Sequence, residues 1–153
     1  KIKSILDGGK TKIGLESTIV DLTNKVSILR PGGITIEQLE KVLHRKLKLR
    51  KLSKNIKSPG QLGIHYSPGI PVRLNAKYPR KKEAFLQFSG KTKGKNNYFS
   101  LSKNGNMKDA AKNLFSILRV IEKKGYSSIA VSKIPNQGLG LAINDRLRKA
   151  SNK

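Results

Sequence analysis

The feature that most constrains this fold is a segment in the middle of the chain that can be neither a helix nor the interior of a strand. Residues 58–68 have the sequence Ser-Pro-Gly-Gln-Leu-Gly-Ile-His-Tyr-Ser-Pro. Proline fixes φ and removes a backbone donor, while glycine permits left-handed geometry. A linker that needed only slack would be rich in glycine and serine and otherwise featureless. The segment therefore indicates a structured connector between two units.

Composition limits what each unit can bury. The chain has 153 residues, of which 36% are hydrophobic and none is cysteine. Two units of about 60 to 80 residues would each be marginal, and no disulfide could support them. The lack of cysteine also excludes thiolate zinc sites and thiolate nucleophiles, and two widely separated histidines argue against a histidine metal site.

The termini and the hydropathy pattern predict a cytoplasmic protein with no membrane partner. No apolar run approaches the roughly 18 residues of a membrane span. The first seven residues are too polar for a secretory signal. The chain begins with Lys1 rather than methionine, which suggests that the amino end of something larger is missing.

The net charge is +24, from 33 basic and 9 acidic residues. Such a charge attracts polyanions. However, the basic residues are mostly lysine and are spread along the whole chain, with only four Phe and four Tyr available for base stacking. This pattern favours a general enrichment in lysine over a dedicated nucleic-acid surface. A small basic RNA-binding or scaffold module without catalysis stays open as the alternative, and a salt titration would distinguish it.

The residues before the connector predict a hairpin, a helix and an edge strand. Two β-branched runs, 14–22 and 26–30, flank a polar turn and are typical of a hairpin. Thr35 and Gln38 form a capping-box pattern that opens a helix. Residues 44–52 alternate Lys or Arg with Leu, which predicts an exposed edge strand protected by its charges. The helix has an apolar stripe at helical spacing, made of Ile36, Leu39, Val42 and Leu43.

The residues after the connector predict alternating strands and helices. Asn106 is a plausible N-cap for a long helix that Gly125 closes, and residues 138–150 form a last helix with a glycine-rich start. This alternation implies an α/β layer arrangement with some parallel pairing. The expected strands are residues 71–74, 83–88, 98–101 and 128–131.

Five motifs in series carry a resemblance to a known family. They are Asp7-Gly8-Gly9, Glu16-Ser17-Thr18-Ile19-Val20-Asp21, Leu29-Arg30-Pro31-Gly32, Ser58-Pro59-Gly60 with His65-Tyr66-Ser67-Pro68, and Gly138-Leu139-Gly140 with Asn144-Asp145-Arg146-Leu147. Together they resemble the carboxy-terminal portion of two-domain YrdC-type threonylcarbamoyl-AMP synthases. These nucleotidyltransferases convert L-threonine, bicarbonate and ATP, with Mg²⁺, into threonylcarbamoyl-AMP and pyrophosphate. Downstream enzymes pass the threonylcarbamoyl group to an adenosine of tRNA.

The resemblance implies an α/β fold in three parts. Residues 1–52 would be the carboxy-terminal part, and so a remnant, of the twisted α/β YrdC-like catalytic domain. Residues 53–70 would be an ordered linker that folds over the active site. Residues 71–153 would be a small Rossmann-like domain.

The resemblance also implies roles for four residues. Ser17 would contact L-threonine through its hydroxyl, and Arg30 would bind ATP through a guanidinium that matches phosphate oxygens. His65 of the linker would contact the nucleotide, and Tyr66 would help to shield the labile carbamate from water. The alternatives are an ordinary strand serine, one more surface cation and a connector histidine packed against its own domain. We identify no catalytic residue and no ligand for Mg²⁺.

The departures from the family pattern predict a chain that is inactive alone. Only six residues precede Asp7, so the family's Lys-x-Arg and Ser-x-Asn motifs, which hold ATP and threonine, are not placed ahead of it. Gln61-Leu62-Gly63 stands where many members have Met, a base and Tyr. We expect activity only with an amino-terminal half supplied as a separate chain.

Three other candidates carry less weight. His44 is expected to face solvent. The Gly138-Leu139-Gly140 segment could offer N–H groups to a phosphate, although a simple turn is the stronger interpretation. Asp145 and Arg146 are expected to point in different directions without pairing.

Overall fold

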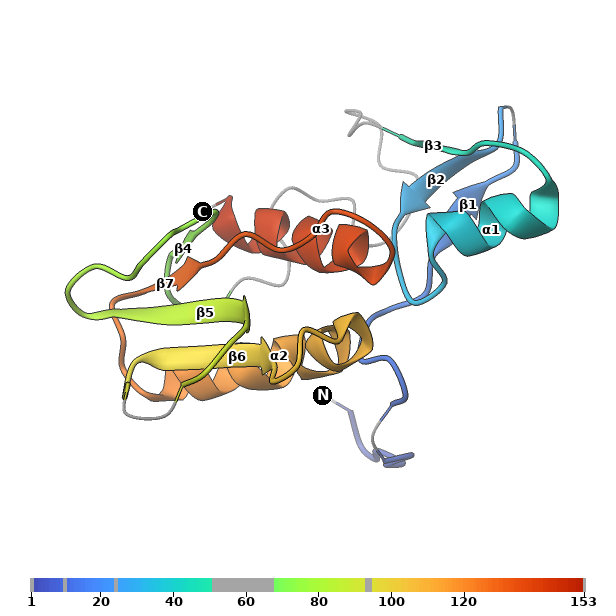
Figure 1. The fold of residues 1–153 in the computed structure, drawn as a ribbon. Coiled ribbons are helices and arrows are strands. Elements are labelled where there is room, and N and C mark those ends of the chain that lie inside the picture. The colour runs from blue at the N-terminus through green and yellow to red at the C-terminus, as the bar shows by residue number, and fades with distance from the viewer. Residues whose placement is uncertain (1, 10, 24, 51–67, 93–94, 153) are drawn as a thin grey trace.

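The chain folds into two β-sheets and three helices within the part that the structure describes (Figure 1). This computed structural model describes residues 2–9, 11–23, 25–50, 68–92 and 95–152. The class is α/β, with one mixed and one parallel sheet. None of the helices in these ranges combines the length and the apolar character that crossing a bilayer requires.

The first sheet belongs to what we call the amino-terminal unit, residues 11–50 without residue 24. Strand β1 (Ile19–Asp21) pairs antiparallel with β2 (Ser27–Arg30), which confirms the predicted hairpin. Helix α1 (Ile36–Leu43) leads to β3 (Lys48–Leu49), which pairs parallel with β2 at the edge of the sheet. The predicted edge strand is therefore present, and within its described part, residues 44–50, it spans two residues.

Helix α1 begins where the sequence predicts, and the carboxy-terminal end of its apolar stripe is exposed. The Gln38 N–H donates to Thr35 Oγ1 at 3.3 Å, and the Thr35 N–H donates to Gln38 Oε1 at 2.8 Å, which completes the capping box. No residue of α1 is buried, and Val42 and Leu43 are 75% and 42% exposed. The helical period is correct, since Ile36 and Leu39 are half-buried, whereas the other two residues of the stripe are exposed.

The second sheet belongs to the carboxy-terminal unit, residues 68–152 without 93 and 94. Its strands are β4 (Val72–Arg73), β5 (Glu83–Ser89), β6 (Tyr98–Ser102) and β7 (Ser128–Val131). They pair in parallel in the order β4-β7-β5-β6, which confirms the expected parallel pairing. The last strand in the sequence is thus an interior strand of the sheet.

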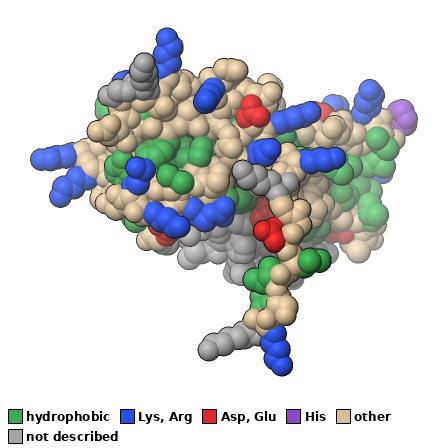
Figure 2. All heavy atoms as spheres, turned by 90° about the horizontal axis from the view of Figure 1, so that it is seen from below, with side chains coloured by type: hydrophobic (Ala, Val, Ile, Leu, Met, Phe, Trp, Pro, Cys, Tyr) green, Lys and Arg blue, Asp and Glu red, His purple; other side chains and the backbone are tan. Residues whose placement is uncertain are grey.

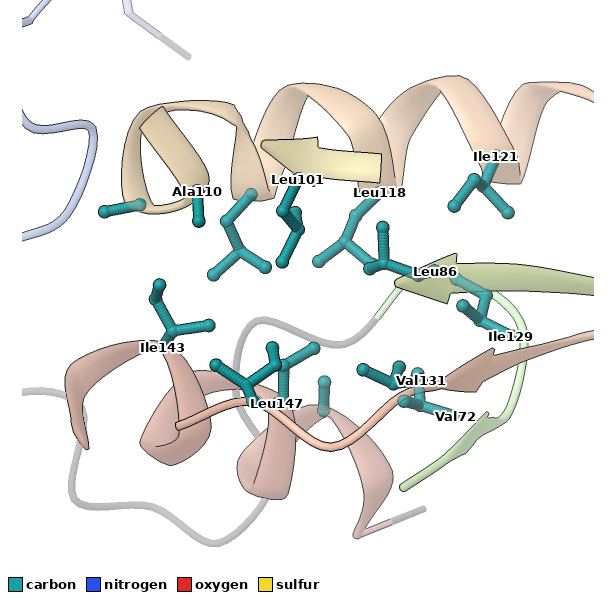
Figure 3. Close-up of a cluster of buried hydrophobic side chains, with 14 of the residues drawn as sticks. Val72, Leu86, Leu101, Ala110, Leu118, Ile121, Ile129, Val131, Ile143 and Leu147 are labelled. Atoms are coloured by element: carbon teal, nitrogen blue, oxygen red, sulfur yellow. The ribbon is translucent and has the colours of Figure 1, made fainter. Parts of the chain in front are cut away.

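Two helices cover one face of this sheet and bury the main core between them (Figure 3). They are α2 (Met107–Lys123) and α3 (Leu139–Ser151). Asn106 caps α2, since its side chain accepts from the N–H groups of Lys108 and Asp109. The core is built from the sheet residues that point toward the helices and from the inner helix residues, among them Val72, Leu86, Leu101, Leu114, Ile121, Ile129, Val131, Ile143 and Leu147.

The opposite face of the sheet is covered by a loop instead of a helix. Ala76, in the loop after β4, packs on Phe85 and Ala130, and Tyr98 lies beside them. The rings of Phe85 and Tyr98 meet edge to face at 5.1 Å. Chain connections therefore run over both faces of the parallel sheet, as such sheets require.

This loop-covered face holds a buried carboxylate. The Arg73 Nη2 group donates to Glu83 Oε2 at 2.6 Å, the Arg80 N–H donates to the same oxygen at 2.7 Å, and Ser128 Oγ donates to Oε1 at 3.0 Å. The hydrogen bond from Arg73, followed by those from Arg80 and Ser128, lowers the pKa of Glu83 to about 2 despite its burial.

Candidate substrate-binding site beside the hairpin

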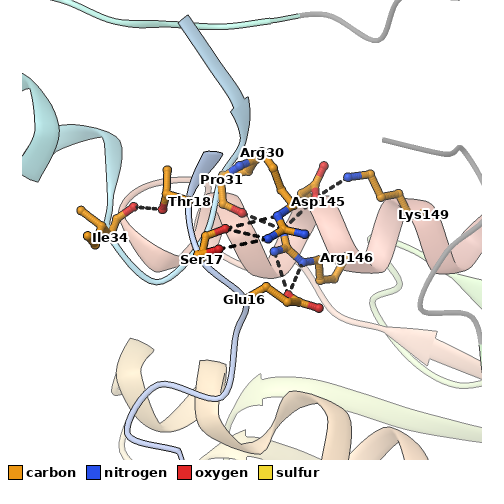
Figure 4. Close-up of polar contacts among 9 residues, drawn as sticks. All are labelled: Glu16, Ser17, Thr18, Arg30, Pro31, Ile34, Asp145, Arg146 and Lys149. Carbon is orange, nitrogen blue, oxygen red and sulfur yellow. Dashed lines mark hydrogen bonds and ion pairs between the residues drawn. The ribbon is translucent and has the colours of Figure 1, made fainter. Parts of the chain in front are cut away.

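Ser17 and Arg30, which the sequence predicts as site residues, lie in direct contact (Figure 4). Ser17 is in the segment that enters β1, and Arg30 is the last residue of β2. Arg30 donates from Nε and Nη2 to the Ser17 carbonyl at 3.2 and 3.0 Å, and from Nη2 to Ser17 Oγ at 3.3 Å. Because Oγ accepts this hydrogen bond, its own proton is directed elsewhere. Ser17 is exposed, so the hydroxyl can donate to a ligand.

Arg30 is more enclosed than the sequence suggests. Its side chain packs against the backbone of Ser17, and the residue is only 8% exposed. A planar guanidinium that holds one carbonyl with two donors fixes the position of that carbonyl. Arg30 therefore orients Ser17, whatever else it contacts.

The backbone of the Arg-Pro-Gly-Gly turn lies directly against Ser17. A Cβ atom on Gly32 would collide with Glu16 O, Ser17 C and Thr18 N. The Gly33 N–H donates to Glu16 O at 2.9 Å, and Thr18 Oγ1 donates to Ile34 O at 2.5 Å. The glycine in this motif is therefore explained by close backbone approach, which keeps the two segments in register.

We expect Gly32→Ala to displace Ser17 and to destabilise the hairpin. All three clashing atoms are backbone atoms, so no side chain can rotate away. Overpacking of this kind costs about 1–3 kcal/mol. Urea unfolding measures the loss, and the amide resonances of residues 16–18 report the displacement. Gly8→Ala is the matched control, since a Cβ there meets nothing within 4 Å. Equal stabilities of the two variants would contradict the proposed close packing.

A buried arginine joins this site to the carboxy-terminal unit. Arg146 of α3 is 1% exposed and donates from Nε and Nη2 to Glu16 Oε2 at 3.0 and 2.8 Å. Its Nη1 group donates to Pro31 O at 2.7 Å and to Asp145 Oδ2 at 2.9 Å. Glu16 and Pro31 flank Ser17 and Arg30 respectively, so α3 holds both strands of the site (Figure 4).

The expectation that Asp145 and Arg146 do not pair is wrong. The Asp145 carboxylate accepts from Arg146 Nη1 at 2.9 Å and from Lys149 Nζ at 2.7 Å. The Asp145–Lys149 spacing of i,i+4 was visible in the sequence. Arg146 and Asp145 can meet because the long Arg146 side chain extends toward Glu16 and Pro31 of the amino-terminal unit and passes the Asp145 carboxylate. Sequence reasoning missed Glu16, whose partner lies 130 positions away.

The glycine-rich start of α3 is occupied by a carboxylate of the chain itself. The Gly138 N–H donates to Glu37 Oε1 at 3.2 Å, and the Gly140 N–H donates to Gln137 O at 2.9 Å. The pKa of Glu37 is lowered by the hydrogen bond from its own backbone N–H and further by that from Gly138. The turn interpretation of this segment agrees with these contacts.

His65 and Tyr66 lie outside the described residues, together with the rest of the connector from residue 58 to residue 67. His44 is exposed, as expected, and ends α1 with a left-handed φ of 48°. In the ranges that the structure describes, no three His, Cys, Asp or Glu side chains gather to hold a metal ion.

Comparison with known proteins decides the family. Residues 34–152 match the model of the threonylcarbamoyl-AMP synthase C-terminal domain. The chain is 36% identical over 172 aligned positions to the threonylcarbamoyl-AMP synthase of Pyrococcus abyssi, covering 99% of this chain and 50% of that protein. The chain belongs to the threonylcarbamoyl-AMP synthase family.

Other members of the threonylcarbamoyl-AMP synthase family agree. The Bacillus subtilis enzyme is 31% identical, covering 99% of this chain and 49% of that protein. A crystal structure of Pyrococcus abyssi Sua5 complexed with L-threonine superposes with a TM-score of 0.78 at 32% identity, covering 95% of this chain and 48% of that one. The chain thus spans about half the length of the relatives that it matches.

The match to the threonylcarbamoyl-AMP synthase domain model begins after the hairpin. Ser17 and Arg30 precede residue 34, where that match starts. They fall in the longer alignment with whole synthases, which takes in 99% of the chain. Arg146 lies inside the domain match and contacts Glu16 outside it. This one side chain therefore connects the two parts of the family resemblance.

Proposed function

We propose that this chain supplies the carboxy-terminal half of a threonylcarbamoyl-AMP synthase that serves tRNA modification in the cytoplasm. Residues 1–52 complete a YrdC-like catalytic domain, residues 53–70 form a linker over its active site, and residues 71–153 form a Rossmann-like domain. The chain acts together with an amino-terminal half, joined to it or separate, and is inactive without it. L-threonine, bicarbonate and ATP are the substrates.

The observation that carries this proposal is the contact between Ser17 and Arg30. An exposed hydroxyl whose oxygen already accepts from a guanidinium is set to donate its proton. A threonine carboxylate is a suitable acceptor, and a hydrogen bond to a charged group is stronger than a neutral one. A relative of this chain has been crystallised with L-threonine, which supports the choice of ligand.

The nucleotide side of the site is proposed from Arg30, His65 and Tyr66. Arg30 places a fixed positive charge next to Ser17, where it favours the phosphates of ATP. His65 and Tyr66 are the consecutive His-Tyr pair of this sequence. A variant of Pyrococcus abyssi Sua5 carries alanine in place of a consecutive His and Tyr and superposes with a TM-score of 0.76 at 30% identity. We assign the same pair here to the nucleotide and the lid.

The open apolar surface of the amino-terminal unit supports a role as half of a larger domain. Val42 of α1 is 75% exposed, and Leu22 beside β1 is 72% exposed. Ile34 and Leu43 add to this surface at 54% and 42%. A contiguous patch of exposed apolar side chains marks an interaction site, and we propose that these side chains form one. The amino-terminal half of the catalytic domain is the proposed occupant.

The positive charge is not concentrated on the face that Figure 2 draws. Lys and Arg side chains are scattered over the face in Figure 2 and gather in no single groove there. The spread agrees with the distribution of basic residues along the sequence. Nucleic-acid binding surfaces concentrate such charge on one face.

A chimaera tests the proposal. This chain replaces the matching half of the Pyrococcus abyssi synthase, and pyrophosphate release is measured with and without L-threonine. We expect release that depends on threonine. In the chimaera, Ser17→Ala should raise the KM for threonine about tenfold to a hundredfold, the value of a hydrogen bond to a charged group.

Ser116→Ala is the matched control for this substitution. Ser116 is exposed on α2, and its hydroxyl donates only to Asn113 O within its own helix, at 2.9 Å. Its KM should equal that of the unsubstituted chimaera. A folded chimaera that binds neither ATP nor threonine would overturn the proposed function.

A further inference from the structure

The parallel sheet of the carboxy-terminal unit has a point at which its connections leave in opposite directions. After β4 the chain passes to the loop-covered face, where Ala76 packs on Phe85 and Ala130. After the neighbouring strand β7 it passes to the helical face, where Ile134 joins the main core. In open parallel sheets, ligands bind at the carboxyl ends of the strands at such a point.

A cavity of about 230 Å³ lies at this position. Its floor is apolar and includes Val131 and Leu147. Its polar lining comes from the ends of both strands, from the segment between β7 and α3, and from α3 itself, and consists of Asn75, Ser132, Lys133, Asn136, Asn144 and Arg148. Pockets for drug-sized ligands have about 300–1,000 Å³, so this cavity suits only a smaller molecule and is too small for a dinucleotide.

The walls of the cavity are held in place by hydrogen bonds. The Ala76 N–H donates to Val131 O at 2.8 Å and ties the loop after β4 to the end of β7. Asn144 Nδ2 donates to Ile134 O and to Asn136 Oδ1, both at 3.2 Å. The Arg148 Nε group donates to Asn144 O at 3.2 Å. The site is therefore formed before any ligand arrives.

The charge of the lining is positive. Lys133 and Arg148 are the charged residues among those described around the cavity, and no Asp or Glu accompanies them. In the described chain neither side chain enters an ion pair. Among the described contacts, the Arg148 guanidinium donates to the protein only from Nε, so its terminal N–H groups can bind a ligand.

We propose that this cavity, which we call the β4–β7 cavity, binds a small metabolite through a phosphate or carboxylate group. The two cations face one anionic group, while the amides and Ser132 hydrogen-bond the remainder of the molecule over an apolar floor. This binding function is separate from the proposed synthase activity and does not depend on it. Ser17 and Arg30 contribute nothing to the cavity.

An NMR titration of the whole 153-residue chain tests the proposal. Inorganic phosphate and succinate are added separately to ¹⁵N-labelled protein at constant ionic strength. We expect saturable shifts of the amides of Asn75, Ser132 and Lys133 with at least one of the two anions. Phosphate alone would identify a phosphorylated ligand, and succinate alone would identify a carboxylate. Saturation with neither would overturn the proposal.

Matched double variants separate this cavity from the general charge of the protein. Lys133→Gln with Arg148→Gln should weaken binding at least ~tenfold, the effect of losing one charge-assisted hydrogen bond. Lys123→Gln with Arg119→Gln removes the same charge from exposed positions of α2 and should leave the affinity unchanged. Equal weakening in both pairs would show that only the net charge of +24 matters and would overturn the proposal. Lys133→Gln alone gives the same test if the first double variant does not fold.

Discussion

Replacing Arg146 with methionine is expected to lower the free energy of unfolding by about 3 kcal/mol. The side chain is 1% exposed, and its removal leaves the Glu16 carboxylate, the Pro31 carbonyl and Asp145 without their shared donor. Breaking a buried ion pair from one side costs about 3–5 kcal/mol because a charge stays behind. Partial exposure of Glu16, 32% for its side chain, places the effect at the low end. Urea unfolding followed by circular dichroism measures it.

The neighbouring Arg148→Met variant is the control. It removes an arginine from the same helix, but this one is exposed and donates only to Asn144 O. Its stability should stay within about 0.5 kcal/mol of the parent chain. The double variant Arg146→Met with Glu16→Gln should lose less stability than the sum of the two single substitutions, since each single substitution already removes the same Glu16–Arg146 interaction. An Arg146→Met chain as stable as Arg148→Met would contradict the bridging role.

Acidification is expected to remove about 3 kcal/mol of stability through Glu83 alone. The pKa of this carboxyl is about 2 in the folded chain, against an ordinary value of 4.5, because Arg73 and two further donors stabilise its charge. A depressed folded-state pKa gives stability that is complete above the unfolded value and is lost as the pH falls toward the folded one. The loss should therefore occur between about pH 5 and pH 2.

The difference between the parent chain and Glu83→Gln isolates this effect from other carboxylates. At pH 7 the variant should be less stable by about 2–3 kcal/mol, since a partly buried Arg73 loses its charged partner. Near pH 2 the two chains should converge. Glu122→Gln is the control, because Glu122 is exposed and glutamine keeps an acceptor for the Gly69 N–H. If the stabilities of the parent chain and of Glu83→Gln fell in parallel as the pH is lowered, the Arg73–Glu83 pair would not be responsible for the acid sensitivity.

Local signals in the sequence predicted the elements well. Thr35 with Gln38, and Asn106 ahead of α2, satisfy helix N–H groups within three residues of themselves. Such contacts depend only on neighbouring positions, so the sequence contains them. The same holds for the hairpin of β1 and β2.

Contacts between distant residues could not be predicted in this way. The Glu16–Arg146 pair and the position of β7 between β4 and β5 depend on how complete elements pack. The apolar stripe of α1 shows that a correct local pattern does not guarantee burial. Its period is set by local sequence, but burial depends on a partner surface, and Val42 has none in the described chain.

The candidate site was predicted in part. Ser17 and Arg30 were chosen through the family resemblance, and the structure brings them into contact. Their functional roles stay predictions, as do those of His65 and Tyr66. Glu16 and Gly32 belong to the motifs of the resemblance but were given no role, because their importance comes from contacts across the fold.

The strand order has a consequence for synthesis on the ribosome. Because β7 is translated after the other three strands and lies between β4 and β5, β4 has no native neighbour in the sheet until β7 has been made. The parallel sheet can close only when Val131 has left the exit tunnel, whereas the β1–β2 hairpin can form as soon as Arg30 appears. Sheets that join distant segments also assemble slowly. The nascent chain therefore carries an unfinished sheet from the appearance of β4 until that of β7.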